Sequence, residues 1–363
     1  MSRILLLSAY DAASHRRWRE QLEAMLPGYE WHALTLPPRF FQWRIRGNPV
    51  SWLTEPRLQE SWDLIIATSM VDLATLRGLH PGLAHTPCLL YMHENQFAFP
   101  VSDRQRGRVE PQMVNLYSAL AADVVAFNSA WNRDSFLQGV EAFLKQMPDA
   151  VPRNLPALLR AKARVLPVPI EDRLFIGKTR PINRDCPHLL WNHRWEYDKG
   201  PDRLFGLLEQ LEQRPLPYRI SVVGEGFRGR PEAFDRIQQR FAGRIEHWGF
   251  MEHRADYDRL LRCADVVVST ALHDFQGLAM LEAMASGCLP LAPDRLAYRE
   301  YVPDSCRYAS SQADARAEAE AAAGRLAGLL EQPPVIGQPH GWRASELRYR
   351  YRTLIESLLG PAQ

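Results

Sequence analysis

The stretch STALHDFQGLAMLEAMASGCLPLAP, from Ser269 to Pro293, carries the pattern that decides the fold. It opens at the end of an apolar run, passes through a polar loop, and enters a helical pattern near Leu278. A second apolar run, Cys288–Ala292, follows the helix. Two apolar runs joined by a helix predict a βαβ unit, in which parallel strands are covered on both faces.

The same alternation extends outward over the whole chain in two series. The first half has five candidate strands and the second half another five, with helical patterns between them. Each series predicts a Rossmann-like layer structure, so the expected fold class is α/β with two such domains. The expected strands are Arg3–Ser8, Asp63–Thr68, Pro87–Met92, Asp123–Asn128, Arg164–Val168, His188–Asn192, Tyr218–Val223, Ile245–Trp248, Asp265–Ser269 and Cys288–Ala292. The expected helices include His15–Met25, Gln112–Ala121, Asp202–Glu212 and Asp256–Arg262.

Domain boundaries follow from a change in composition. A polar, proline-containing segment, 171–187, separates the two series and predicts a linker. We expect an N-terminal domain over residues 1–170 and a second domain over 188–340. An Ala-, Glu- and Arg-rich stretch, 312–331, predicts a surface helix, and the segment 341–363 predicts a helix that packs back across the domains.

Composition and length exclude several classes of protein. The 363 residues suffice for about two domains at roughly 150 residues each, and 46% hydrophobic with 24% charged residues is ordinary globular composition. No run approaches the ~20 apolar residues of a membrane span, and the apolar run after Arg3 is too brief for a signal peptide. We therefore expect a cytoplasmic protein. Five scattered cysteines indicate neither a disulfide framework nor a zinc site.

Arginines cluster in the first third of the chain, although the net charge is only +2. Arginine pairs bidentately with phosphate, so the clusters suit a polyanionic partner such as RNA. A solvated surface explains the same charges. The clusters are Arg16, Arg17 and Arg19; Arg39, Arg44 and Arg46; and Arg104, Arg106 and Arg108.

The polar loop before Leu278 favours phosphate binding. Asp274 and Gly277 lie in this loop, and Glu282 lies on the following helix. A helix N-terminus offers free N–H groups and a positive dipole end to an anion. An ordinary helix with a solvated glutamate is the alternative interpretation.

Two further loops follow expected strands. Arg194 and Lys199 come after the strand that ends at Asn192, where the carboxyl edge of a parallel sheet binds ligands. Gly224, Glu225 and Gly226 follow the next strand, although a plain turn explains this motif equally well. Fixed cations beside a helix N-terminus can stabilise a departing diphosphate, as sugar transfer from a nucleotide donor requires. No DxD-type metal site is evident from the sequence, so we expect no metal requirement.

Taken in chain order, the three motifs resemble those of the retaining glycosyltransferases of family 4. These enzymes have a GT-B fold with a donor and acceptor cleft between two domains. The resemblance implies that Arg194 and Lys199 hold the diphosphate and that Asp274, where the family usually has Glu, contacts the transferred sugar. It implies further donor contacts from backbone N–H groups of Gly277 and Leu278, and from Glu282 to the ribose. From the residues themselves, we add Gly224 and Glu225 as donor contacts, because glycine lets backbone approach a nucleotide. We also add Phe250, in the segment Trp248–Met251 whose backbone is expected to read the base.

The N-terminal half resembles the tRNA-queuosine alpha-mannosyltransferase-like family within this group. The similar segments are LLYMHENQFAFP (Leu89–Pro100), Ser14-His15, FFQWRIRGNP (Phe40–Pro49) and HDFQG. The resemblance implies GDP-mannose as donor, queuosine in a tRNA as acceptor and retained configuration. It places His93 near the sugar and assigns acceptor contacts to His15, Glu94, Asn95, Gln96, Trp43, Arg44 and Arg46.

The segment from Phe40 to Arg46 adds an argument of its own. It interleaves aromatic side chains with arginines, and such side chains stack on unpaired bases while arginines hold phosphates. A partly buried hydrophobic loop is the alternative. Two rival functions also stay open: a family 4 enzyme that uses another nucleotide sugar on a lipid or polysaccharide, and a GT-B-like RNA-binding protein without turnover. The sequence does not predict an oligomeric state.

Overall fold

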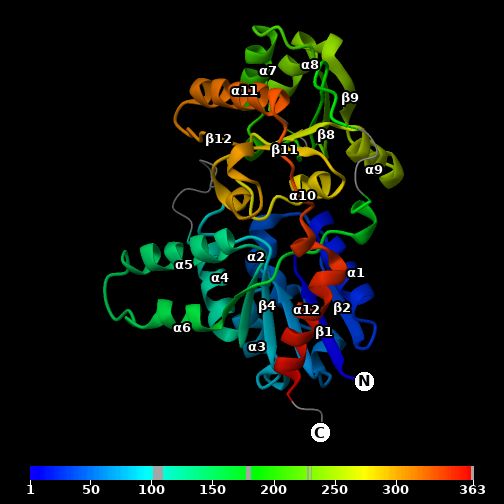
Figure 1. The fold of residues 1–363 in the computed structure, drawn as a ribbon. Coiled ribbons are helices and arrows are strands. Elements are labelled where there is room, and N and C mark those ends of the chain that lie inside the picture. Colours follow the sequence, from blue (N-terminus) through cyan, green and yellow to red (C-terminus); the bar gives the residue numbers. More distant parts are fainter. Residues whose placement is uncertain (101–108, 177–180, 227–228, 230, 361–363) are drawn as a thin grey trace. The chain divides into compact units, whose positions relative to one another are not determined.

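The computed structural model describes residues 1–100, 109–176, 181–226, 229 and 231–360 (Figure 1). The chain divides into two compact units, Met1–Pro169 with Ala344–Gln363, and Ile170–Arg343. The described part of the segment expected as a linker belongs to the second unit. No helix in the described ranges is long and apolar enough to cross a membrane.

The first unit contains a six-stranded sheet in which all neighbouring strands are parallel. Its order is β2-β1-β3-β4-β5-β6, so the chain reverses its direction of progress across the sheet between β1 and β3. Ligands bind outside the carboxyl ends of parallel strands at such a point. The strands are β1 Arg3–Ser8, β2 Glu30–Thr35, β3 Leu64–Thr68, β4 Cys88–Met92, β5 Val124–Phe127 and β6 Ala163–Val165.

Alternating residues of β1 face two different layers, because side chains alternate across a strand. Leu5 and Leu7 belong to the hydrophobic core that also contains Ile45 of α2 and Val114 of α4. Ile4, Leu6 and Ser8 have the opposite orientation and are also buried. The helices of the unit are α1 Ala13–Met25, α2 Phe41–Ser51, α3 Leu73–Leu79, α4 Glu110–Ala121, α5 Ala130–Leu144, α6 Leu155–Lys162 and α12 Ala344–Leu359, with short 3-10 turns η1 Pro56–Gln59 and η2 Pro81–Leu83.

Helix α12 completes the first unit, although it lies at the other end of the sequence (Figure 1). The hydroxyl of buried Tyr351 accepts a hydrogen bond from Trp18 Nε1 at 2.9 Å and donates one to Pro167 O at 2.9 Å. The rings of Trp18 and Tyr91 stack with centroids 4.2 Å apart. Tyr351 Oη also lies 3.1 Å from Tyr91 Oη of β4, so α12 is fastened to both α1 and the sheet.

The second unit contains another six-stranded parallel sheet, ordered β12-β11-β10-β7-β8-β9. Its point of reversal lies between β7 and β10. The two parallel α/β sheets confirm the predicted fold class. The strands are β7 His188–Trp191, β8 Arg219–Val223, β9 Ile245–Gly249, β10 Val266–Val268, β11 Leu289–Pro293 and β12 Arg307–Tyr308. The α-helices are α7 Pro201–Glu212, α8 Ala233–Arg240, α9 Arg254–Cys263, α10 Leu278–Ala285 and α11 Ala315–Glu331. The 3-10 turns are η4 Asp172–Leu174, η5 Tyr197–Lys199, η6 Ala242–Arg244, η7 Leu296–Glu300, η8 Asp304–Cys306 and η9 His340–Trp342.

Helix α11 has a buried face, where the sequence predicted a surface helix. It packs against α7 (Figure 1), and its Ala322, Ala323 and Leu326 are buried. Its Glu318 is also buried and accepts hydrogen bonds from Arg203 Nε at 3.1 Å and from Arg295 Nη1 and Nη2 at 2.7 Å each. One carboxylate thus joins α7, α11 and the segment after β11.

Candidate active site

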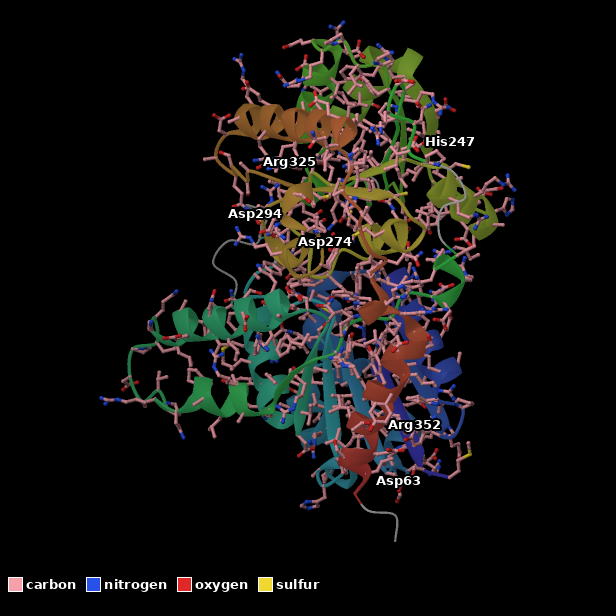
Figure 2. All side chains as sticks on the ribbon, in the orientation of Figure 1. Asp63, His247, Asp274, Asp294, Arg325 and Arg352 are labelled. Atoms are coloured by element: carbon pink, nitrogen blue, oxygen red, sulfur yellow. The ribbon has the colours of Figure 1, made fainter. Side chains whose placement is uncertain are left out.

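The carboxyl edge of the second sheet gathers the residues expected to bind the donor. Arg194 follows β7, and Asp274 and Gly277 follow β10, the two strands at the point of reversal. Figure 2 shows Asp274 in the loop beside α10. This edge is where an open parallel sheet binds its ligand.

Lys199 lies in the interior of this edge, with a side chain only 9% exposed. Its Nζ donates to His273 O at 2.8 Å and lies 3.2 Å from Asp198 Oδ2 and 3.5 Å from Asp274 Oδ2. Burial alone would raise the pKa of Asp274, but the Lys199 ammonium, together with the neighbouring histidines and the N–H of Gly277, outweighs burial and holds that pKa below its usual value. Asp274 is therefore an ionised acceptor beside a fixed cation.

Arg194 differs from Lys199 in its exposure. Its side chain is 49% exposed, and its Nη2 lies 3.1 Å from Glu196 Oε2. Two imidazoles that the sequence analysis did not single out, those of His193 and His273, are buried close by. Burial, followed by the positive charge of Lys199, lowers the pKa of each to about 4, and Arg194 adds to the effect. Both cations therefore act on the same pair of neutral histidines.

Gly277 lies directly before the first residue of α10 and has a left-handed backbone conformation with φ +78°. A Cβ at this position would lie 2.2 Å from Tyr301 Oη, so no larger residue fits without displacement. The N–H of Gly277 donates to Asp274 Oδ1 at 2.9 Å. The resemblance assigns this N–H to phosphate, whereas the structure shows it bonded to the carboxylate that precedes the helix; Leu278 is the first residue of α10.

Glu282 lies inside the second unit, where it accepts hydrogen bonds from Arg254 Nη2 at 3.0 Å and from Tyr257 Oη at 3.1 Å. Asn192 Nδ2 donates to the same tyrosine at 2.9 Å. A ribose would therefore meet a carboxylate that is already oriented by an arginine and a tyrosine. Neither Arg254 nor Tyr257 stood out in the sequence, because nothing in the local pattern marks a residue that acts through Glu282.

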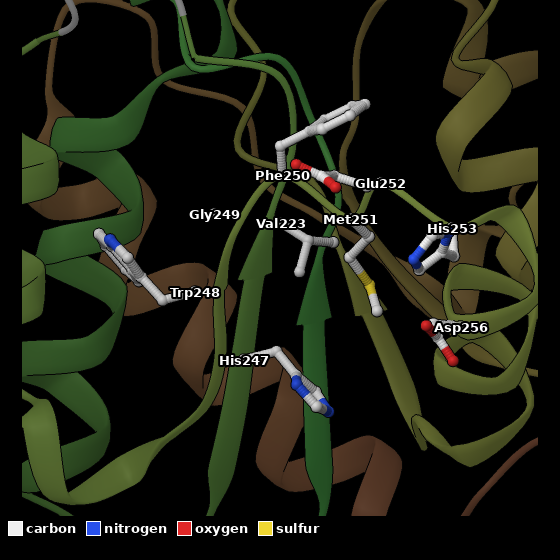
Figure 3. Close-up of a pocket in the computed structure, with 9 residues that line it drawn as sticks. All are labelled: Val223, His247, Trp248, Gly249, Phe250, Met251, Glu252, His253 and Asp256. Atoms are coloured by element: carbon white, nitrogen blue, oxygen red, sulfur yellow. The ribbon is translucent and has the colours of Figure 1, made fainter.

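A pocket of about 200 Å³ lies at the carboxyl ends of β8 and β9. Figure 3 shows its lining, which includes Val223, Trp248, Gly249 and Phe250. Phe250 is 64% exposed. We expected the base to be read near Trp248–Met251, and this pocket lies at that segment.

Packing inside the protein, rather than close approach to a nucleotide, explains why residue 224 is glycine. A Cβ at Gly224 would lie 1.8 Å from His193 O, so its missing side chain lets two strand-end loops of the sheet approach each other. The exposed Glu225 contributes its carbonyl, which accepts from Trp195 N at 2.9 Å.

The carboxyl edge of the first sheet gathers a second polar cluster. His15 Nε2 lies 3.0 Å from Glu94 Oε2, and Ser69 Oγ donates to Glu94 Oε1 at 2.6 Å. The rings of His15 and His93 stack with centroids 4.1 Å apart. Burial opposes protonation of His15, but Glu94, together with Asp11 and the backbone of Tyr10, outweighs burial and raises the His15 pKa. Burial and His15 together hold the pKa of His93 well below its usual value. The cluster therefore stacks an imidazole whose pKa is raised on one whose pKa is lowered.

Asn95 occupies an interior position, in contrast to the acceptor role that the resemblance implies. It is 0% exposed. Its Nδ2 donates to Asn132 Oδ1 at 2.8 Å, and its Oδ1 accepts from the N–H groups of Phe97 and Ala98. Its amide therefore holds the turn after β4 rather than facing a ligand. Gln96 is partly exposed, and its backbone N–H donates to Asn115 Oδ1 at 2.7 Å.

The segment that interleaves aromatic residues with arginines forms helix α2. From the sequence alone, a partly buried loop was the alternative. Arg44 is buried, and its Nε lies 3.4 Å from Pro37 O, so this guanidinium faces the protein. Trp43 is exposed, and Arg46 Nη1 donates to Asp72 Oδ2 at 2.6 Å with its side chain half-exposed. Of the remaining clustered arginines, Arg16 and Arg19 lie beside Asp11, whereas Arg104, Arg106 and Arg108 fall outside the described residues.

Comparison with solved structures agrees with the observed fold. Sucrose-phosphate synthase from Thermosynechococcus elongatus matches with a TM-score of 0.70 at 15% identity, covering 99% of each chain. Anabaena HepE, solved with UDP and glucose, matches with a TM-score of 0.64 at 14% identity, covering 99% of this chain and 100% of its own. Residues 187–331 match the family model described as glycosyl transferases group 1. The fold and the family match thus define a glycosyltransferase of the GT-B type.

Sequence relatives narrow the assignment. Residues 3–170 match the model described as tRNA-queuosine alpha-mannosyltransferase N-terminal. The tRNA-queuosine alpha-mannosyltransferase of Drosophila melanogaster is 34% identical over 318 residues, which cover 85% of this chain and 84% of that protein. The chain belongs to the tRNA-queuosine alpha-mannosyltransferase family.

Proposed function

We propose that the protein transfers mannose from GDP-mannose to queuosine in the anticodon of a tRNA, with retained configuration. The observation that carries this proposal is the 34% identity to the Drosophila melanogaster enzyme over 85% of the chain. The N-terminal match over residues 3–170 supports it, because this half holds the polar cluster of His15, Glu94 and His93.

The chemistry of the second unit supports transfer from a nucleotide-diphosphate sugar. As the bond between the sugar C1 and the phosphate oxygen breaks, negative charge grows on the diphosphate. Arg194 and Lys199 are the cations that stabilise this charge, and fixed groups of this kind act without reorganising during the reaction. Lys199 is held by His273 O and the two aspartates, so its position is preorganised.

The proposed transfer takes place on one face of the sugar. The acceptor hydroxyl oxygen attacks C1 from the side on which the diphosphate leaves, and its proton passes to the departing phosphate oxygen. This route demands neither a strong protein base nor a metal ion. Transfer is therefore expected to continue in the presence of a chelator.

The direct test incubates the protein with queuosine-bearing tRNA and, in separate reactions, GDP-mannose, UDP-glucose and UDP-galactose. The nucleosides are then released and weighed. We expect queuosine to gain the mass of one hexose in the reaction with GDP-mannose and to stay unchanged with the two other donors. Transfer from another donor would disprove the donor assignment, and unchanged queuosine in every reaction would disprove the function.

A paired substitution tests the role of Arg194. Arg194→Ala removes one fixed cation and is expected to lower kcat by about 10²–10³, a typical loss for a group that stabilises transition-state charge. Arg244→Ala is the matched control, because Arg244 is a similarly exposed arginine of the same unit that pairs with Glu212 at 2.9 Å. Near-normal turnover of the Arg194→Ala enzyme would refute this role.

A further inference from the structure

Two large aromatic side chains lie exposed at the start of helix α2. Phe40, which precedes the first turn, is 70% exposed, and Trp43 is 51% exposed. Phe40 also has a left-handed backbone with φ +56°, which is uncommon for a bulky residue and often marks a functional segment. We call Phe40 and Trp43 together the aromatic shelf.

The indole of Trp43 lies flat on the helix because residue 47 is glycine. A Cβ built on Gly47 would lie 2.5, 2.6 and 2.7 Å from Cδ2, Cε2 and Cε3 of Trp43. Nearly equal distances to three fused-ring carbons place that point over the face of the ring. Gly47 is buried although it lies on the exposed side of the helix, because the indole covers it. One face of the indole is thus held by the helix, and the ring retains a large exposed surface.

Two arginines, Arg39 and Arg46, lie beside the aromatic shelf. The guanidinium carbon of Arg39 lies 5.6 Å from the centroid of the Phe40 ring. Arg46 extends from the next turn and pairs with Asp72 while half-exposed. Flat aromatic faces beside arginines are the combination that binds unpaired nucleotides, since the rings stack on bases and the cations meet phosphates.

The aromatic shelf is fixed to a loop that also makes a hydrogen bond to the polar cluster. Asn48 of α2 is fully buried; its Nδ2 donates to Met70 O at 3.2 Å, and its Oδ1 accepts from Asp72 N at 3.2 Å. One residue before Met70, Ser69 donates to Glu94. The shelf and the Glu94–His15 pair are therefore attached to the same four residues, 69–72.

We propose that the aromatic shelf stacks on an unpaired base that neighbours the modified nucleotide of the RNA acceptor, and that Gly47 is the residue that lets Trp43 do so. This inference rests on the proposed tRNA acceptor. It assigns base stacking to Trp43 and Phe40 and phosphate contact to Arg39 and Arg46, while Arg44 serves the interior of the unit.

The test measures binding of a queuosine-bearing anticodon stem-loop that carries 2-aminopurine beside queuosine. Trp43→Ala is expected to raise the Kd by about 10- to 100-fold, the effect of losing one stacked base, and to abolish quenching of the 2-aminopurine fluorescence. Trp43→Phe is expected to restore most of both. GDP binding, which tests the integrity of the second unit, stays unchanged in each variant.

Gly47→Ala separates stacking from a purely structural role. Alanine favours a helix interior more than glycine does, so the thermal midpoint is expected not to fall, while the new Cβ displaces the indole and weakens RNA binding. Tyr349→Ala removes another exposed aromatic residue of the same unit, on α12, and serves as the control with unchanged binding.

The outcomes distinguish this inference from the proposed function. If the wild-type protein mannosylates tRNA but Trp43→Ala or Gly47→Ala binds the stem-loop within twofold of wild type, the shelf does not stack on RNA and the inference is overturned. If the wild-type protein transfers no sugar to queuosine yet loses RNA binding in both variants, the stacking surface stands and the proposed function fails.

Discussion

The imidazole of His15 stacks on that of His93 with centroids 4.1 Å apart and an angle of 21° between the rings. The two groups have opposite tendencies, since Glu94 raises the pKa of His15 despite burial, whereas burial lowers the pKa of His93. A single stack thereby joins one imidazole whose pKa is raised and one whose pKa is lowered.

Glu94→Gln is expected to lower the pKa of His15, because the variant removes the carboxylate that raises it. His15 binds its proton more tightly in the folded chain than in the unfolded one. The stability it contributes is therefore full below about pH 6.5, the ordinary histidine pKa, and is lost as the pH rises through the raised value. Titration of the His15 ring by NMR measures the shift. An unchanged pKa in Glu94→Gln would show that Glu94 does not control this proton.

Lys199→Met is expected to raise the pKa of Asp274 and to reduce kcat, because it removes both the cation beside that carboxylate and a stabiliser of the diphosphate. An aspartate with a lowered pKa contributes stability above the ordinary value of about 3.9 that is lost as the pH falls. The variant should therefore lose stability at neutral pH and show a smaller further loss on acidification. Acid titration of unfolding checks this, with exposed Lys145→Met as the control; identical acid profiles for Lys199→Met and wild type would contradict it.

Glu318→Ala is expected to lower the free energy of unfolding by about 3–5 kcal/mol, since it leaves Arg203 and Arg295 buried without their carboxylate. Urea denaturation measures the loss. Glu246→Ala is the comparison, because its pair with Arg219 is exposed and worth less than about 1 kcal/mol. Similar losses in the two variants would mean that burial does not govern these ion pairs.

Gly277→Ala is expected to cost about 1–2 kcal/mol from the left-handed backbone alone, with a further cost from the contact with Tyr301. Activity should fall with it, because the loop of Asp274 and the start of α10 must shift. Gly78→Ala is the control: a Cβ there has open space within α3. Thermal unfolding and turnover measure both effects, and a Gly277→Ala protein that matches Gly78→Ala in both would refute the steric argument.

The strands of the sheet interiors were predictable because their apolar runs are continuous. β1 was expected at Arg3–Ser8 and is found there. β2, with the sequence EWHALT, escaped prediction because it is an edge strand whose residues are mostly half-exposed. α2 escaped because Gly47 and Pro49 contradict helix propensity, while burial of Ile45 and the bonds of Asn48 stabilise the helix.

The position of a candidate residue at a sheet edge was predictable where a motif directly follows a strand, as with Arg194 after β7. Glu94, after β4, was named only through the family resemblance. Residues that hold those groups carry no local signal. Ser69 is one serine among many until the fold brings it within 2.6 Å of Glu94, 25 residues further along the chain. Arg44 illustrates the opposite error, since its charge suggested phosphate whereas its position on α2 turns it inward.

Docking of α12 has a consequence for how the polypeptide matures during synthesis. Trp18 and Tyr91 are made early, but Tyr351, which bonds to the first and stacks near the second, emerges from the ribosome only after the whole of Ile170–Arg343. The first unit therefore lacks α12 until the second unit has been translated. A chain that stops short of residue 351 would contain the whole of the second unit but would leave Trp18 of the first unit without its Tyr351 partner.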